Sequence, residues 1–348
     1  MNNDVSSTHR KGVKYALCLL LWFAVSPWAL AGEVSKGVTK HDDIPWAEAG
    51  GRTLSLDIYQ PEAASKAPVV VIYHGGGWLI NNESVMDAMS AYLAEHGGYV
   101  VANVNYRLLP DNDNTTRMNE IVEDVFGGLL WVKAHIAEYG GDPTRIAVTG
   151  DSAGGHLASM VLTRGRALES DGFAGDSLGF NPTWLPAGKT AEQVADDDGL
   201  AVQAAVISYG AFDLLAAAQG GFETKGNMFW QFAGAEPRGI FGAAVTVQNQ
   251  PDYYRAVSPI FNIPQASEYQ LPPQFHHVGS IDTTTPPEAV KAYVAKLKAA
   301  GQAASVTVYE GNNHAYMDTG CIEALGSCFD THAVPVLKDI LVFLDKNL

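Results

Sequence analysis

Gly150-Asp151-Ser152-Ala153-Gly154-Gly155 is the stretch of sequence that decides the fold. The apolar run Arg145 to Thr149 before it is typical of a short buried strand, and His156 to Leu162 after it is typical of a helix. A G-x-S-x-G motif between a strand and a helix holds a serine at a sharp turn, with its hydroxyl exposed. The small residues Gly150 and Gly154 leave room for the neighbouring strand and helix. Because an ordinary glycine-rich turn can also contain a serine, the rest of the chain must supply a base, an acid and amide donors.

The composition indicates a globular protein with a large hydrophobic core. Of the 348 residues, 47% are hydrophobic and 17% are charged, so long disordered regions are not expected. A chain of this length often forms a single α/β domain. The formal net charge of −16 favours solubility and offers no electrostatic surface for nucleic acid.

The first residues have the pattern of a signal peptide. Basic residues between positions 10 and 14 precede an apolar run from Tyr15 to Val25, and Ala29-Leu30-Ala31 offers a cleavage site of the A-x-A type. The apolar run is too short for a comfortable membrane span. We therefore expect residues 1–31 to be removed. Residues 32–348 would then be a single exported domain, periplasmic or secreted, without a stable membrane anchor.

Downstream, strand patterns alternate with helical patterns. Strands are predicted at 54–59, 69–73, 99–104, 145–149, 204–208, 275–279 and 305–309. Helices are predicted at 84–96, 117–139, 156–162, 287–300 and 334–348. This alternation predicts an α/β protein with a mostly parallel, doubly wound sheet of about eight strands and helices on both faces. Alternating apolar and polar residues in 54–59 indicate an edge strand.

Two aromatic-rich stretches, at about 165–200 and 214–273, interrupt the alternation. We expect both insertions to emerge at the carboxyl ends of strands, where open α/β sheets bind ligands, and to form a cap or pocket wall. For any single aromatic residue the alternative is packing into the small core of its own insertion.

Amide donors are predicted in His74-Gly75-Gly76-Gly77-Trp78, which follows the strand 69–73. An attacked acyl carbon builds negative charge on its oxygen, so N–H groups must already point at it. The predicted donors are the backbone N–H groups of Gly76, Gly77 and Ala153. The predicted supporting residues of the two motifs are His74, Gly75, Gly150, Asp151 and Gly154. A plain glycine-rich turn at residues 74–78 is the alternative.

His314 is the predicted base. It follows the strand 305–309, and in this type of site the order along the chain is Ser, then Asp or Glu, then His. Four other histidines fit less well. His276 and His277 lie within a strand, His332 opens the last helix, and His156 lies one helical turn beyond the serine.

Asp282 is the predicted acid that orients the base. It follows the strand 275–279 and precedes the helix 287–300, which begins with proline. The rival is Asp213, which ends the segment 207–212.

Cys321 and Cys328 are predicted to form a disulfide, because Cys18 would leave with the signal peptide and an exported protein tends to oxidise a remaining pair. Two free thiols are the alternative. Since the pair follows His314 closely, we expect the bridge to stiffen the loop that carries the base.

These motifs resemble those of the serine α/β-hydrolase superfamily, and most closely those of esterases of the hormone-sensitive-lipase type. The resemblance rests on residues 74–78, on residues 150–155 and on Asn105-Tyr106-Arg107-Leu108, and it extends from about Leu54 to the C-terminus. It implies the α/β-hydrolase fold and hydrolysis of short-chain or small aromatic carboxylic esters without a cofactor. That family usually carries a helical cap before the core, whereas only a short segment separates Gly32 from Leu54 here. In this respect the chain is more similar to exported acetyl-xylan or feruloyl esterases.

The sequence thus predicts an exported serine carboxylesterase that acts on a small-molecule ester through an acyl-enzyme on Ser152, with neither a cofactor nor a metal ion. The same residues would serve an amidase, an arylformamidase or a small peptidase. A non-catalytic binding protein on a hydrolase scaffold is a further alternative, although such proteins usually lose the serine or the histidine, and both are present here.

Overall fold

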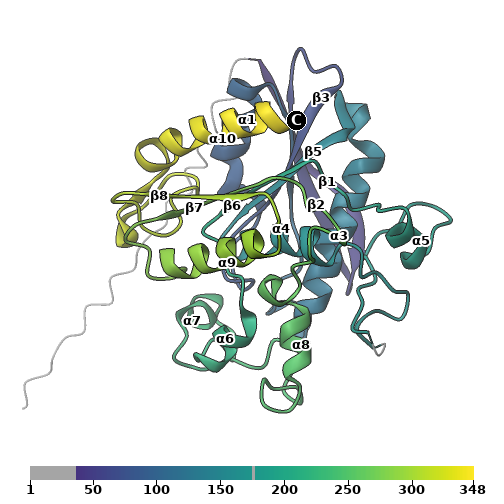
Figure 1. The fold of residues 1–348 in the computed structure, drawn as a ribbon, viewed down its shortest axis with the longest axis vertical. Helices are drawn as coiled ribbons and strands as arrows, with labels where there is room; N and C mark the ends of the chain where they lie inside the picture. The colour runs from purple at the N-terminus through teal and green to yellow at the C-terminus, as the bar shows by residue number, and fades with distance from the viewer. Residues whose placement is uncertain (1–36, 175–176) are drawn as a thin grey trace, which may run out of the picture. The chain divides into compact units, whose positions relative to one another are not determined.

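The centre of the protein is an eight-stranded sheet in the order β1-β2-β4-β3-β5-β6-β7-β8, seen in a computed structural model that describes residues 37–174 and 177–348 (Figure 1). Its strands are β1 (Val38–Ala49), β2 (Arg52–Pro61), β3 (Ala67–Tyr73), β4 (Val100–Val104), β5 (Gly141–Asp151), β6 (Ala204–Ser208), β7 (Gln274–Gly279) and β8 (Ala304–Tyr309). β1, β2 and β4 pair antiparallel, and all pairs from β4 through β3 to β8 are parallel. The predicted mostly parallel sheet is therefore confirmed.

The middle of the sheet is buried on both faces, which explains its sequence. Val69, Val70, Val71 and Ile72 of β3 are all fully buried, as is most of β4 beside it. Branched side chains suit such a strand because they pack well on a pleated surface that helices cover from both sides. A continuous run of apolar residues is the result, in place of an alternating one.

The prediction that 54–59 is an edge strand was wrong. β1 lies outside it, with Ile44 opposite Leu56 and Ala47 opposite Leu54, so β2 is an interior strand. The alternation in β2 fits an antiparallel strand in general, and it does not distinguish an edge from the second position. β1 itself was missed because Asp42, Asp43 and Pro45 interrupt its pattern at two register shifts.

Helices cover both faces of the sheet. The longer ones are α1 (Asp87–Gly97), α3 (Met118–His135), α4 (Ala153–Arg164), α9 (Pro287–Ala299) and α10 (Val334–Asn347). α1 and α10 contact each other on one side of the sheet, and α4 and α9 lie on the other side, as Figure 1 shows. Short helical segments complete this layer: η1 (Glu83–Met86), α2 (Asp111–Asn114), η2 (Ile136–Tyr139), η5 (Glu323–Leu325) and η6 (Phe329–Ala333).

The two insertions leave the sheet in different ways. The second holds α6 (Leu214–Gln219), α7 (Met228–Ala233), α8 (Pro251–Ala256) and η4 (Pro259–Phe261), and it follows the carboxyl end of β6. The first holds η3 (Gly172–Ala174) and α5 (Ala191–Asp196) and follows the C-terminus of α4. Because α4 runs back from the carboxyl end of β5, the first insertion begins at the opposite end of the sheet. The expectation that both emerge at the carboxyl ends was therefore wrong for residues 165–200.

Most aromatic residues of the insertions pack against one another. The ring of Phe173 from the first insertion stacks on Phe241 of the second, with centroids 5.4 Å apart, and lies edge-on to Tyr253. Trp230 and Tyr254 are fully buried. The two insertions thus share an aromatic core, and only a few of their rings remain free to face a substrate.

The predicted signal peptide, residues 1–31, lies outside the described residues. Within 37–174 and 177–348, no helix combines the length and the apolar character that crossing a membrane requires.

Candidate active site

Ser152 occupies a strained turn between β5 and α4. Its backbone has φ 51° and ψ −113°, a conformation that residues with a side chain rarely adopt. Close packing holds it there. A Cβ atom on Gly154 would lie 1.8 Å from the carbonyl oxygen of Tyr73, and one on Gly150 would lie 2.4 Å from the backbone of Gly154. The two motif glycines are therefore required by contact between backbones, as the sequence predicted.

The structure brings the side chains of Ser152, His314 and Asp282 together from three loops at the carboxyl ends of the sheet. His314 Nε2 lies 2.9 Å from Ser152 Oγ, and His314 Nδ1 lies 2.8 Å from Asp282 Oδ2. All three residues are buried. A carboxylate only accepts hydrogen bonds, so Nδ1 carries the proton and Nε2 is free to accept one from the serine hydroxyl.

The Asp282 carboxylate is fixed by its own loop. Its Oδ1 accepts hydrogen bonds from the backbone N–H groups of Thr284 and Thr285, at 2.8 and 2.9 Å, and its Oδ2 accepts one from Thr285 Oγ1 at 3.1 Å. These donors stabilise the charged carboxylate and orient Oδ2 toward His314. The rival Asp213 instead caps α6, where its Oδ1 accepts from the N–H of Ala216 at 2.8 Å.

The other histidines have structural partners. His156 lies beneath the elbow between Trp78 Nε1, at 3.2 Å, and the carbonyl oxygen of Val257, at 2.7 Å. His277 contacts Ser208 Oγ and the Tyr316 hydroxyl, while His276 contacts Gln274. Burial lowers the pKa of His156 to about 4 and that of both strand histidines to about 3, so all three are neutral packing residues.

The predicted amide donors lie in the loop that follows β3 and at the first residue of α4. Gly76 and Gly77 have φ values of 114° and 62°, which turn the backbone of this loop sharply. Within the described residues, the N–H groups of Gly76, Gly77 and Ala153 have no hydrogen-bond acceptor. Ala153 is the first residue of α4, so its N–H has no partner in the helix and carries part of the positive end of the helix dipole.

Buried polar contacts hold this loop from behind. The Tyr106 hydroxyl donates to the carbonyl oxygen of His74 at 2.5 Å, and the two rings stack with centroids 4.3 Å apart. Burial lowers the pKa of His74 to about 4, so the ring is neutral. The N–H of Gly75 donates to the carboxylate of Asp151, the residue before the serine. Tyr106 thus gives the Asn-Tyr-Arg-Leu motif its physical role as a support of the loop.

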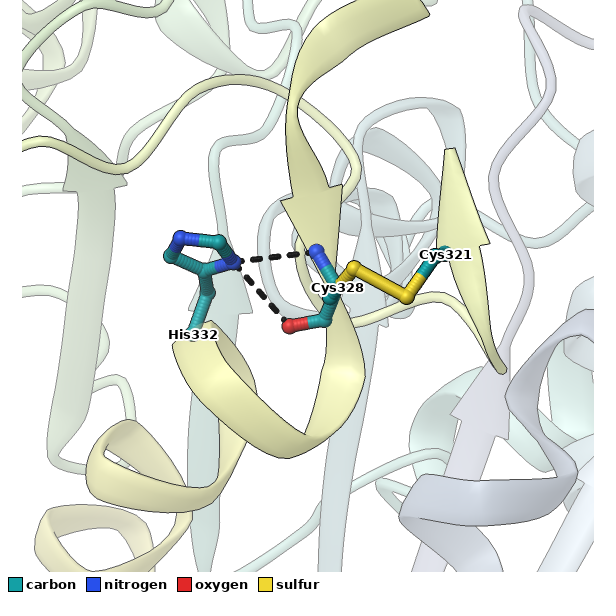
Figure 2. Close-up of a disulfide and its surroundings, with 3 residues drawn as sticks. All are labelled: Cys321, Cys328 and His332. Carbon is teal, nitrogen blue, oxygen red and sulfur yellow. Dashed lines mark hydrogen bonds between the residues drawn. A yellow bond between two sulfur atoms is a disulfide. The ribbon is translucent and has the colours of Figure 1, made fainter. Parts of the chain in front are cut away.

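The segment after His314 is held by a disulfide-closed hairpin (Figure 2). Cys321 and Cys328 are bonded, as predicted, and they face each other across the paired strands β9 (Cys321–Ile322) and β10 (Ser327–Cys328). Ser327 Oγ donates to the carbonyl oxygen of His314 at 2.8 Å, so the hairpin contacts the histidine directly. His332 packs against the outer side of the bridge, where its Nδ1 accepts from the N–H of Cys328 at 2.9 Å.

Two further residues, Tyr209 and Asp318, contact His314 or the loop that carries it, and no sequence pattern pointed to them. The Tyr209 ring lies 4.9 Å from the imidazole, and its hydroxyl accepts from the N–H of Met317 at 3.1 Å. Asp318 makes a hydrogen bond to Asp151, which joins the histidine loop to the elbow. Burial raises the pKa of both carboxyls, that of Asp151 to about 6, so we expect the two to share a proton. Only their spacing from Ser152 and His314 could have indicated them.

Comparison with known proteins identifies the family of this chain. The family model named BD-FAE matches residues 56–297, which is most of the central sheet together with both insertions. The chain belongs to the BD-FAE family.

The relatives and neighbours of this BD-FAE chain carry esterase names. It is 32% identical over 279 residues to esterase LipQ of Mycobacterium tuberculosis, an alignment that covers 79% of this chain and 56% of LipQ. It is 35% identical over 128 residues to carboxylesterase NlhH of the same organism, covering 37% of each chain. The chain therefore spans about half the length, or less, of these relatives.

A solved structure shows the same fold. Thermogutta terrifontis esterase Est2 superposes with a TM-score of 0.59 at 21% identity, over 89% of this chain and 93% of that one. The fold of this BD-FAE chain is the α/β-hydrolase fold, as the motifs predicted.

Proposed function

We propose that the protein is a carboxylesterase that hydrolyses small carboxylic esters through an acyl-enzyme on Ser152. One observation carries the proposal: a serine hydroxyl, an imidazole and a carboxylate form a continuous hydrogen-bonded chain, and the N–H groups of Ala153, Gly76 and Gly77 have no acceptor among the described residues. The esterase names of its relatives LipQ and NlhH support the same reaction.

In the first half of the reaction, Ser152 Oγ attacks the acyl carbon while His314 Nε2 takes the hydroxyl proton. The carbonyl oxygen becomes an oxyanion, which the N–H groups of Gly76, Gly77 and Ala153 stabilise. Asp282 stabilises the imidazolium that forms. The ester C–O bond then breaks, and the leaving alcohol takes the proton from His314 Nε2.

In the second half, a water molecule attacks the acyl-enzyme. His314 Nε2 removes its proton, the bond between the acyl carbon and Ser152 Oγ breaks, and the carboxylic acid leaves. The proton passes from His314 Nε2 to Ser152 Oγ, so the enzyme is regenerated and water is the only reactant consumed besides the ester.

We expect the aromatic side chains beside the glycine-rich loop at residues 74–78 to determine which acyl groups the site accepts. The ring of Phe229, on α7, lies against Gly77, where an added Cβ would approach it within 2.9 Å. Phe222 lies edge-on to Trp78 with centroids 5.6 Å apart. We expect aromatic rings this close to the glycine-rich loop to favour a short acyl chain or a small aromatic acyl group over a long, branched one.

Replacement of the nucleophile tests the reaction. Ser152→Ala should abolish turnover of p-nitrophenyl acetate and labelling by a fluorophosphonate probe. Among the residues that the structure describes, no other hydroxyl forms a hydrogen bond with His314 Nε2. The matched control is Ser159→Ala on the same helix, whose hydroxyl donates to the carbonyl oxygen of Gly155 and does not contact His314. Turnover that survives in Ser152→Ala would refute the scheme.

Export of the protein is part of the proposal. It is supported by the basic and apolar pattern of residues 1–31 and by the disulfide between Cys321 and Cys328, which persists in oxidising compartments. Expression of the full chain, followed by N-terminal sequencing of the protein outside the cytoplasm, should give a mature chain that begins at Gly32. Recovery of only the uncleaved chain would contradict export.

A further inference from the structure

A second group of charged side chains, at the antiparallel end of the sheet, has no part in the proposed hydrolysis. Carboxylate oxygens of Asp43, Asp57 and Glu83 all lie within 4.8 Å of one another. Within residues 37–174 and 177–348, no other three potential metal ligands gather this closely. Carboxylates at such distances repel one another, so the fold must compensate their charge.

A register shift in β1 brings Asp43 to the two buried carboxylates of the group. β1 has a register shift between His41 and Ile44, and Asp43 at that shift has φ 53°. Its N–H donates to Asp57 Oδ1 at 2.8 Å, which brings the two residues together. Asp57 and Glu83 are only 3% and 7% exposed, whereas Asp43 is exposed. Two carboxylates of the group are therefore buried, and the third, that of Asp43, is exposed to solvent.

An independent observation comes from Asn103 on β4. It is the register partner of Asp57 on β2, so the two side chains project from the same face of the sheet. Its Nδ2 donates to the carbonyl oxygen of Glu83 at 2.8 Å, and the residue is fully buried. In the part of the chain that the structure describes, neither Asn103 Oδ1 nor Glu83 Oε2 has a hydrogen-bond partner. A buried oxygen without a partner is destabilising, so two of them beside buried carboxylates favour a bound cation.

Lys40 compensates only part of the charge. Its Nζ lies 2.8 Å from Asp42, 3.0 Å from Asp57 and 3.2 Å from Asp87. One ammonium group thus forms ion pairs with three carboxylates. Asp43 and Glu83 remain without a basic partner among the described residues.

The donor set suits calcium. Ca²⁺ takes oxygen ligands, carboxylate and carbonyl, at about 2.3–2.6 Å, so oxygens on opposite sides of the ion lie about 5 Å apart. The spacing of the three carboxylates fits within this limit. A cavity of about 240 Å³, lined by Asp43, Glu83 and Asn105 among others, opens beside them and has room for the water ligands that complete the coordination.

We propose that Asp43, Asp57, Glu83 and the side-chain oxygen of Asn103 form a Ca²⁺ site that joins β1, β2 and β4 to η1. Glu83 follows the glycine-rich loop at residues 74–78 closely along the chain. The ion would therefore stabilise the antiparallel end of the sheet and the base of that loop. It takes no part in the reaction at Ser152.

The test measures Ca²⁺ binding and thermal stability of the full chain after removal of metal with a chelator. Ca²⁺ alone, titrated to about 1 mM, the range of weak extracellular sites, should bind with a stoichiometry of one and raise the melting temperature by several degrees. Glu83→Gln, which keeps the shape of the side chain, should lose both effects. The matched control Asp42→Asn removes a neighbouring carboxylate that contacts only Lys40, and it should keep both.

Asp43→Asn provides a second variant, because Asn tolerates the positive φ at this position and the residue is exposed. It should weaken Ca²⁺ binding at least tenfold without a loss of stability in the metal-free protein. Absence of Ca²⁺ binding in the unmodified chain would overturn the proposal, as would a Ca²⁺-dependent shift that Glu83→Gln retains in full. A rise in metal-free stability in Glu83→Gln, with no Ca²⁺ effect in the unmodified chain, would assign a proton to the site in place of the ion.

Discussion

Ser152 and His314 lie within hydrogen-bonding distance of each other, yet the segments that carry them are held in different ways. The serine turn is fixed by backbone against backbone, with Gly154 pressed against the carbonyl oxygen of Tyr73. The histidine loop is fixed by side chains: the disulfide hairpin through Ser327, the Tyr209 ring, and Asp318 against Asp151. We therefore expect the serine turn to tolerate no larger residue at Gly150 or Gly154, whereas the position of His314 depends on several contacts, each of which can be weakened separately.

The largest effect should come from Gly154→Ala. A Cβ atom 1.8 Å from a backbone oxygen cannot be accommodated by moving a flexible side chain, so β3 and α4 must separate. We expect a loss of about 3 kcal/mol or more in the free energy of unfolding, or failure to fold, measured by urea unfolding. Gly220→Ala is the control, because it lies at the exposed end of α6 with ordinary φ, and it should change stability by less than about 0.5 kcal/mol. Near-native stability of Gly154→Ala would contradict the role of backbone packing at the elbow.

Loss of the disulfide should have an intermediate effect. Cys321→Ser with Cys328→Ser should lower the free energy of unfolding by about 2 kcal/mol on the chain-entropy model. Because Ser327 contacts the carbonyl oxygen of His314, kcat for p-nitrophenyl acetate should fall while KM changes less. Melting curves and steady-state kinetics measure both quantities. If the melting temperature and kcat are unchanged, the hairpin does not position the base.

The smallest effect should come from Asp318→Asn, and it should depend on pH. Burial raises the pKa of Asp151 to about 6 and that of Asp318 well above its usual value, so the folded protein binds more protons than the unfolded chain. The contribution of the pair to stability is therefore present at low pH and is lost as pH rises from about 4 through 6 and above. His314, Tyr106 and Tyr209 are the other titratable groups facing the pair.

Asn at position 318 keeps a donor for Asp151 and removes one of the two ionisations. Relative to the unmodified protein, the variant should gain about 1 kcal/mol or more as pH rises from about 4 to about 7. Urea unfolding across this range measures the difference. Asp330→Asn, an exposed residue of the same region, should show none. A difference that stays constant with pH would exclude the shared proton.

The order of residues in the sequence was enough for the main elements of the site. The elbow, the glycine-rich loop, Asp282 and His314 each follow a predicted strand, and parallel strands bring their carboxyl ends to one edge. The sequence could not reveal β1, because a bulge and a proline hide its alternation. Nor could it show where the first insertion begins, since that depends on the direction of α4.

Local patterns and the rules of chain connection were therefore sufficient to predict the fold class, the serine turn and the groups expected around it, with Asp282 favoured over Asp213. The contact of Asp318 with Asp151, and the gathering of Asp43, Asp57, Glu83 and Asn103 at the antiparallel end of the sheet, became visible in the folded protein alone. Such contacts join residues far apart along the chain, and they depend on strand register and side-chain burial, which no local pattern records.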